Sequence, residues 1–130
     1  MEKDSIAKSY KDLRVFQQAL ELAAEIFERT KKFPAEERYS MIDQIRRSSR
    51  SVCTNMGEAW RKRRYQAAFI SKLNDSEAEA CETQIWSLIA MRCGYLSKHE
   101  AEQWEQKYDY VLAQLVVMMR EASKWILKQK

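Results

Sequence analysis

Four cationic side chains follow one another in the sequence, a run whose guanidinium and ammonium groups can bind phosphate or carboxylate oxygens. They are Arg61, Lys62, Arg63 and Arg64. Only Glu58 lies close to them along the chain, so local carboxylates cannot neutralise the run. Trp60 and Tyr65 flank it, and their flat side chains could stack on bases or could serve core packing and helix capping.

This run ends a longer basic segment. Residues 36–65 hold eight Lys/Arg and four Asp/Glu, so the segment carries +4, which equals the net charge of the whole chain. A basic excess on one face of a small protein is typical of proteins that bind nucleic acid. We therefore predict contacts with RNA or another nucleic acid from one stripe, made of Arg46, Arg47, Arg50, Arg61, Lys62, Arg63 and Arg64. Alternatively, the stripe pairs with the carboxylates Glu77, Glu79 and Glu82.

The sequence offers little for catalysis. His99 is the single histidine, no Glu-x-x-His pair occurs, and the chain has no glycine-rich phosphate loop. The three cysteines, Cys53, Cys81 and Cys93, lack a metal-type spacing. We expect a protein that is not an enzyme and uses no metal or cofactor.

The basic stripe needs a rigid helix to carry it. Two glycines and one proline in 130 residues are too few for the turns of a sheet protein, so we predict an all-α chain. Apolar residues at spacings of three and four predict helices over 12–32, 36–63, 66–93 and 98–128. Short loops between them favour one domain, 1–130, folded as an up-down-up-down antiparallel four-helix bundle.

Particular residues define the ends of these helices. Asp12 is the expected N-cap of the first, and Pro34 breaks the chain before the second. Gly94 suits the position after the third helix, and the segment from Ser97 to Glu100 matches a capping box that opens the fourth.

Two helices have more apolar residues than one core stripe needs. In the first, we assign Leu13, Phe16, Leu20, Ala24 and Phe27 to the core. A second face then remains on the first and third helices, and we predict that it forms an oligomer interface; its residues are Val15, Ala19, Leu22, Ile26, Ala78, Ile85 and Ile89. A wide core stripe with some exposed apolar side chains is the alternative. A module that binds another protein through these faces is the competing function.

No apolar run approaches the ~20 residues that a membrane-spanning helix needs. The charged beginning of the chain lacks the apolar centre of a signal peptide. We expect a cytoplasmic protein with no membrane partner.

Several segments resemble one known family in order along the chain. Residues 12–16 (DLRVF) are similar to its opening motif, and Phe33-Pro34 with Glu37 to its first loop. The most specific similarity lies in residues 44–48 (QIRRS) and 51–59 (SVCTNMGEA), followed by 82–85 (ETQI) and 94–96 (GYL). On these motifs, which span roughly residues 10–125, the chain resembles the bacterial four-helix-bundle family of 23S rRNA intervening-sequence proteins.

The resemblance implies an up-down bundle, a homopentameric ring and a link to RNA. It also implies relatedness to accessory proteins of diversity-generating retroelements, which are basic pentamers that bind nucleic acid and a reverse transcriptase. The family supplies no catalytic residues. Cys53 and Ala59 stand where many members have proline and glycine, so the second helix should be straight there.

Overall fold

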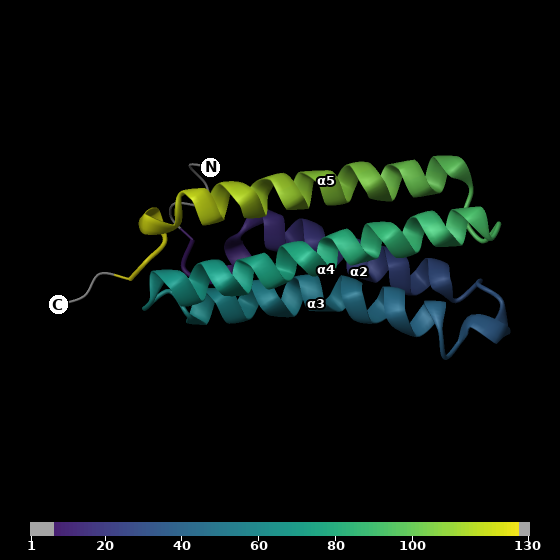
Figure 1. The fold of residues 1–130 in the computed structure, drawn as a ribbon, viewed down its shortest axis with the longest axis horizontal. Helices are drawn as coiled ribbons and strands as arrows, with labels where there is room; N and C mark the ends of the chain where they lie inside the picture. The colour runs from purple at the N-terminus through teal and green to yellow at the C-terminus, as the bar shows by residue number, and fades with distance from the viewer. Residues whose placement is uncertain (1–6, 128–130) are drawn as a thin grey trace.

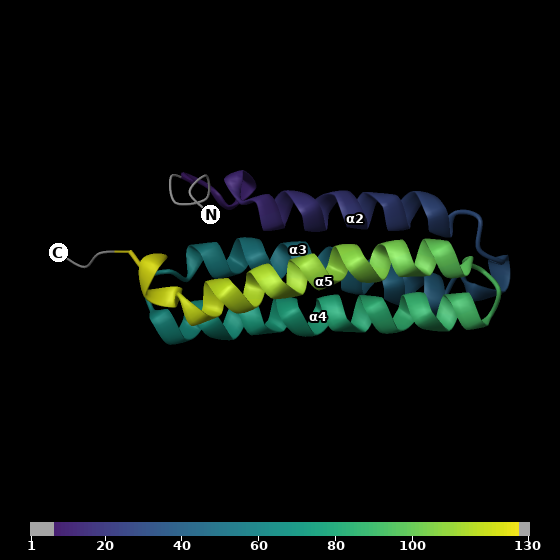
Figure 2. The same cartoon turned by 90° about the horizontal axis from the view of Figure 1, so that it is seen from above.

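The computed structural model, which describes residues 7–127, consists of four long helices joined by short connections (Figure 1). They are α2 (Arg14–Thr30), α3 (Met41–Arg61), α4 (Gln66–Arg92) and α5 (Lys98–Arg120), with the 3-10 turns η1 (Tyr10–Asp12), η2 (Ala35–Glu37) and η3 (Ala122–Lys124). Consecutive helices run in opposite directions, which confirms the all-α class and the up-down-up-down bundle. Figure 2 shows α2 and α4 at opposite edges of the bundle.

Two helix ends differ from the prediction. The second helix begins at Met41 instead of residue 36, because the segment after Pro34 forms η2 and Ser40 has φ −129° and ψ −99°, outside the helical region. The fourth ends at Arg120 and is followed by η3; its predicted end at 128 lies outside the described residues. Asp12 does not cap α2, whose N-cap is Leu13, but closes a capping box in η1.

The connection from α4 to α5 follows the prediction. Gly94 has φ +82°, and the amide of Tyr95 donates to the carbonyl of Ala90 at 2.9 Å, which closes the end of α4. The hydroxyl of Ser97 accepts from the amide of Glu100 at 3.0 Å, and the Glu100 carboxylate accepts from the amide of Ser97 at 2.9 Å. The capping box thereby provides partners for the backbone amides of Ser97 and Glu100, which have none within the helix.

The core face of α2 is the reverse of the predicted one. Val15, Ala19, Leu22 and Ile26 are at most 2% exposed, so the prediction that they line an oligomer interface is wrong. The expected core residues Leu20 and Phe27 are instead 53% and 36% exposed. The face centred on Ala19 is therefore the one that enters the core. The stripe with Phe16 and Phe27 turns toward α3, where Tyr10 packs edge-on against Phe16 and arginines stack on Phe27.

Between α3 and α4 the core uses small polar side chains. Ser76 Oγ donates to the carbonyl of Val52 at 2.7 Å, and Thr83 Oγ1 donates to Ser48 Oγ at 2.8 Å, all inside the core. Small residues bring the two backbones close together, and these hydrogen bonds link the two helices across the core. Leu88 of α4 lies outside this core and is 46% exposed.

Among the described residues, no helix is both long enough and apolar enough to span a membrane.

Candidate nucleic-acid interface

The predicted basic stripe divides into two groups along α3. Arg46, Arg47 and Arg50 lie in the first half of the helix, whereas the run from Arg61 to Arg64 lies at its end and in the turn that follows. Arg61 lies eleven positions after Arg50, a rise of about 16 Å at 1.5 Å per residue. The two groups therefore lie on different parts of the bundle.

Arg47 is already neutralised within the bundle. Its guanidinium donates to both carboxylate oxygens of Glu79, at 3.0 and 3.2 Å, and also to Glu82. These hydrogen bonds raise the pKa of Arg47, Glu79 contributing most and Glu82 next. For this residue the structure bears out the alternative of pairing with the acidic helix, since Arg47 holds α3 against α4.

Arg46 and Arg50 surround one aromatic ring. Their guanidinium groups lie 4.7 and 5.7 Å from the centre of the Phe27 ring on α2. Arg46 Nε also donates to Thr30 Oγ1 at 2.9 Å, which places a cation beside the C-terminal end of α2, where the helix dipole favours it. Arg46, Arg47 and Arg50 line an open groove of about 570 Å³ on α3.

At the end of α3, Arg63 has a packing role. Its guanidinium lies 3.6 Å from the centre of the Trp60 ring, and its Nε donates to the Trp60 carbonyl at 2.9 Å. Trp60 is 6% exposed and packs edge-on against Trp125 at 6.2 Å. Trp60 is thus a core residue and not a stacking platform, while Tyr65, the N-cap of α4, is 65% exposed.

The other three cations of the run, Arg61, Lys62 and Arg64, are exposed. Burial lowers the pKa of Arg63 below its usual value, and the neighbouring charge of Arg61 lowers it further. That repulsion indicates a positive local potential, which a bound anion would relieve.

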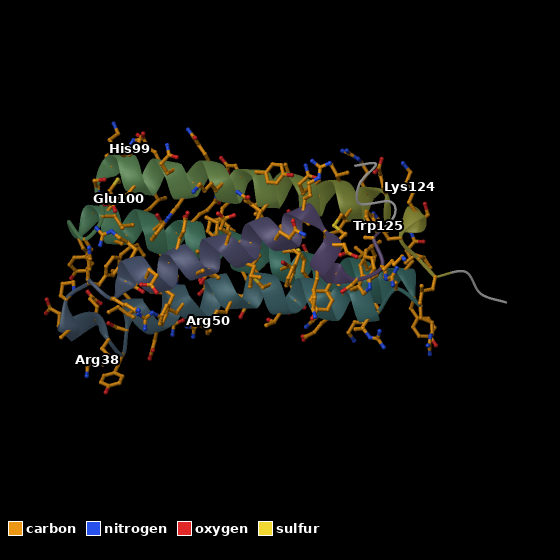
Figure 3. All side chains as sticks on the ribbon, turned by 180° about the vertical axis from the view of Figure 1, so that it is seen from behind. Arg38, Arg50, His99, Glu100, Lys124 and Trp125 are labelled. Atoms are coloured by element: carbon orange, nitrogen blue, oxygen red, sulfur yellow. The ribbon has the colours of Figure 1, made fainter. Side chains whose placement is uncertain are left out.

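More basic residues gather at the same end of the bundle, where α2 and α4 begin and α3 and α5 end (Figure 1). Leu127 N donates to Arg63 O at 3.0 Å, so the segment that follows η3 lies against the α3–α4 turn. Figure 3 shows Lys124 and Trp125 at this end and His99 and Glu100 at the other. We call the following residues the basic end: Lys11, Arg14, Arg61, Lys62, Arg63, Arg64, Arg120 and Lys124.

Among the described residues, carboxylates also lie near the basic end, but they do not cancel its charge. The Asp12 carboxylate caps η1. Glu58 Oε1 pairs with Lys72 Nζ at 3.7 Å, and Glu121 Oε1 pairs with Lys124 Nζ at 3.2 Å. Sequence reasoning missed Lys11, Arg14, Arg120 and Lys124, because it summed charge over consecutive segments. Summing charge by bundle end would have found them, since antiparallel helices bring alternate termini together.

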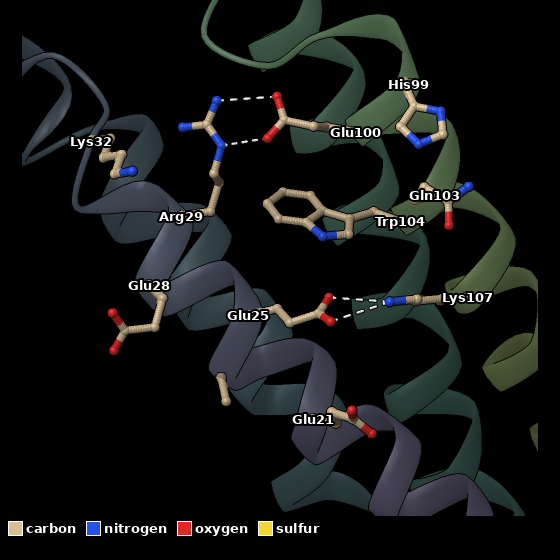
Figure 4. A pocket seen from close by; sticks show the side chains of 11 residues that line it. Glu21, Glu25, Glu28, Arg29, Lys32, His99, Glu100, Gln103, Trp104 and Lys107 are labelled. Carbon is tan, nitrogen blue, oxygen red and sulfur yellow. Dashed lines mark hydrogen bonds and ion pairs between the residues drawn. The ribbon is translucent and has the colours of Figure 1, made fainter.

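A wider groove separates α2 from α5 (Figure 4). Its volume is about 730 Å³, and two ion pairs cross it: Arg29 Nε to Glu100 at 2.6 Å and Lys107 Nζ to Glu25 at 3.2 Å. Trp104 lies between the two pairs. Because cations and carboxylates alternate here, this groove has no basic excess and favours neither anions nor cations.

The second apolar face of α4 is exposed, in contrast to that of α2. Ile85 and Ile89 are 50% and 37% exposed, and Ala78 is exposed on the same side. For these three residues the oligomer interface stays a prediction.

Cys53 is buried, and burial raises the pKa of its thiol to about 11, whereas Cys81 and Cys93 are exposed. Within residues 7–127, His, Cys, Asp and Glu side chains form no group of three that could hold a metal ion.

Comparisons with known proteins give one family. The model of the family described as 23S rRNA-intervening sequence protein matches residues 11–117. A crystal structure of a protein with unknown function from the S23 ribosomal protein family, from Bacteroides thetaiotaomicron VPI-5482, is similar at 27% sequence identity and a TM-score of 0.71. The similarity covers 81% of this chain and 97% of that one. No curated protein matches the chain.

Proposed function

The chain belongs to the family of 23S rRNA-intervening sequence proteins, and from that premise we propose that it is a non-enzymatic, homo-oligomeric bundle protein of the cytoplasm that binds RNA or another nucleic acid. The basic end is the contact surface in this proposal. The observation that carries it is the convergence of basic residues from η1, α3, the α3–α4 turn, α5 and η3 on one end of the bundle. Cations from several elements can follow a phosphate backbone in a way that one helix face cannot.

Within the basic end, Arg61 and Lys62 are the proposed phosphate contacts. Both are exposed, and neither takes part in an ion pair within the described part of the chain. Tyr65, exposed beside them, is the candidate for stacking on a base. Arg47 and Arg63 act as structural residues, because their guanidinium groups already bind Glu79 and Trp60.

Self-association multiplies this surface. A net charge of +4 per chain is modest, but several basic ends in one particle would bind a long anionic ligand with a gain in avidity. The family resemblance favours a pentamer as the particle.

The test compares two double charge reversals. R61E/K62E alters the basic end, whereas K32E/K98E makes the same change in net charge with exposed lysines at the opposite end. With a fluorescent single-stranded RNA, we expect R61E/K62E to lose binding and K32E/K98E to retain most of it. Each cation removed from a phosphate contact should reduce the salt slope by about 1. Equal affinities of the two variants would contradict the proposal.

A protein-interaction module is the second candidate, because Ile85, Leu88 and Ile89 form an exposed apolar face on α4. Nucleic acid that stays with the protein through purification at low salt, seen as a high ratio of absorbance at 260 to 280 nm, favours the first function. Protein that is free of nucleic acid favours the second.

A further inference from the structure

The outward face of α4 has the pattern of a coiled-coil seam. Its exposed residues recur at spacings of 3, 4, 3, 4 and 3, and none is charged; they are Ser71, Asn74, Ala78, Cys81, Ile85 and Leu88. Such a repeat places one continuous stripe on the helix, which suits packing against other helices. We call these residues the α4 seam. From Asn74 to Leu88 it extends about 21 Å.

A second apolar surface lies between α2 and α3. Phe16 and Leu20 of α2 and Gly57 of α3 line an open groove of about 510 Å³, together with the ring of Tyr10. Leu20 is 53% exposed, and the apolar stripe continues along α2 to Phe27. We call this the α2–α3 groove. From Phe16 to Phe27 it extends about 16 Å, a length similar to that of the α4 seam.

The two surfaces have opposite charges at their edges. Glu77 lies beside the α4 seam, and the described residues provide it with no ion-pair partner, whereas Asp75 pairs with Lys72 at 3.7 Å. Arg50 lies beside the stripe that continues the α2–α3 groove and is stacked toward Phe27, whereas Glu58 and Arg61, which line the groove itself, have opposite charges. If the α4 seams of two molecules packed against each other, like charges would meet. The same would happen if two α2–α3 grooves packed against each other. When the α4 seam of one molecule packs into the α2–α3 groove of another, the carboxylate of Glu77 can approach the guanidinium of Arg50.

We infer that the α4 seam of one molecule packs into the α2–α3 groove of a second copy of this chain. The inference rests on the self-association in the proposed function and adds the faces that meet. Because α2 and α4 lie at opposite edges of the bundle (Figure 2), every molecule can use both surfaces at once. The contact is head-to-tail, which closes into a ring when the rotation between neighbours allows it. In a ring all bundles point the same way, so the basic ends gather on one rim.

Two exposed positions allow each surface to be blocked separately. I85D places a charge in the α4 seam, and L20D places one in the α2–α3 groove. V116D is the matched control, because Val116 is 41% exposed on α5, outside both surfaces. Circular dichroism should show the same helical signal for all three variants, since none of the side chains is buried.

Light scattering gives the decisive result. We expect the wild-type protein and V116D to form the same oligomer, and I85D and L20D each to be monomers of 15.5 kDa. An equal mixture of I85D and L20D should form a dimer of twice that mass and nothing larger, because each molecule keeps one intact surface and the two are complementary. A mixture that stays monomeric would overturn the inference, and so would a dimer of L20D alone, which would indicate seam-to-seam packing.

The same samples separate this inference from the proposed function. If the wild-type protein is an oligomer and L20D or I85D remains one, the inference fails while self-association stands. If the wild-type protein is itself a monomer, both fail. If the mixing result is as expected but no variant or wild-type protein binds the RNA, the inference stands and the nucleic-acid function fails.

Discussion

The guanidinium of Arg63 lies 3.6 Å from the centre of the Trp60 ring and donates to the Trp60 carbonyl at 2.9 Å. Arg63 therefore stabilises the end of α3 by packing on Trp60, whereas its neighbours Arg61 and Lys62 remain exposed. A run of four similar cations thus contains residues with different roles, and substitutions can separate them.

R63A should destabilise the bundle, because it removes the stacking on Trp60 and the hydrogen bond to its carbonyl. We expect the free energy of unfolding in urea to fall by about 1–2 kcal/mol. R61A, in which the lost side chain is exposed, should change it by less than about 0.5 kcal/mol. Equal effects of the two substitutions would contradict the packing role of Arg63.

The hydrogen bond between Thr83 and Ser48 should couple α3 to α4. T83V keeps the shape of the side chain but leaves the Ser48 hydroxyl without this partner, so we expect a cost of about 1–3 kcal/mol. In a double-mutant cycle with S48A, the two costs should fall short of additivity by about 1 kcal/mol. Additive costs would show that the bond at 2.8 Å contributes nothing of its own.

The two glycines should respond in opposite ways to alanine. Gly94 has φ +82°, where a Cβ is strained, so G94A should cost about 1 kcal/mol. Gly57 lies inside α3, and a Cβ there would meet the Tyr10 ring at an ordinary contact of 3.8 Å. G57A should therefore stabilise the protein by up to about 1 kcal/mol. Thermal unfolding of both variants measures the difference, and a destabilised G57A would mean that Tyr10 needs the space.

Glu100 should make stability depend on pH in acid. The hydrogen bond from Arg29, helped by the Ser97 amide, lowers the pKa of Glu100 from 4.5 to about 2. Because the folded-state pKa is below the unfolded one, this carboxylate stabilises the fold above about pH 4.5, and its contribution disappears as the pH falls toward 2. The stability difference between wild type and E100Q should be constant near neutral pH and shrink across that interval. A difference that is the same at pH 2 and pH 7 would refute this account.

The sequence predicted the bundle because helix signals act locally. Gly94 and the Ser97–Glu100 capping box closed α4 and opened α5 as expected. The face of α2 that enters the core could not be chosen in this way. Its two apolar stripes have similar periodicity, and only the structure shows that Ala19 is buried while Phe27 lies under an arginine of α3.

The candidate site shows the same limit. The cationic run at residues 61–64 was visible in the sequence, but only the fold adds Lys124, through the contact of Leu127 with Arg63. The fold likewise removes Arg47, because Glu79 lies in the following helix, 32 residues along the chain. Pairings across the bundle depend on helix rotation, which periodicity alone leaves open.

Light scattering at low and at high salt, with absorbance at 260 and 280 nm recorded on the same peak, tests self-association and nucleic-acid binding together. We expect a particle of several 15.5 kDa chains that carries nucleic acid at low salt and releases it at high salt. A 15.5 kDa monomer with the absorbance ratio of pure protein under both conditions would contradict it.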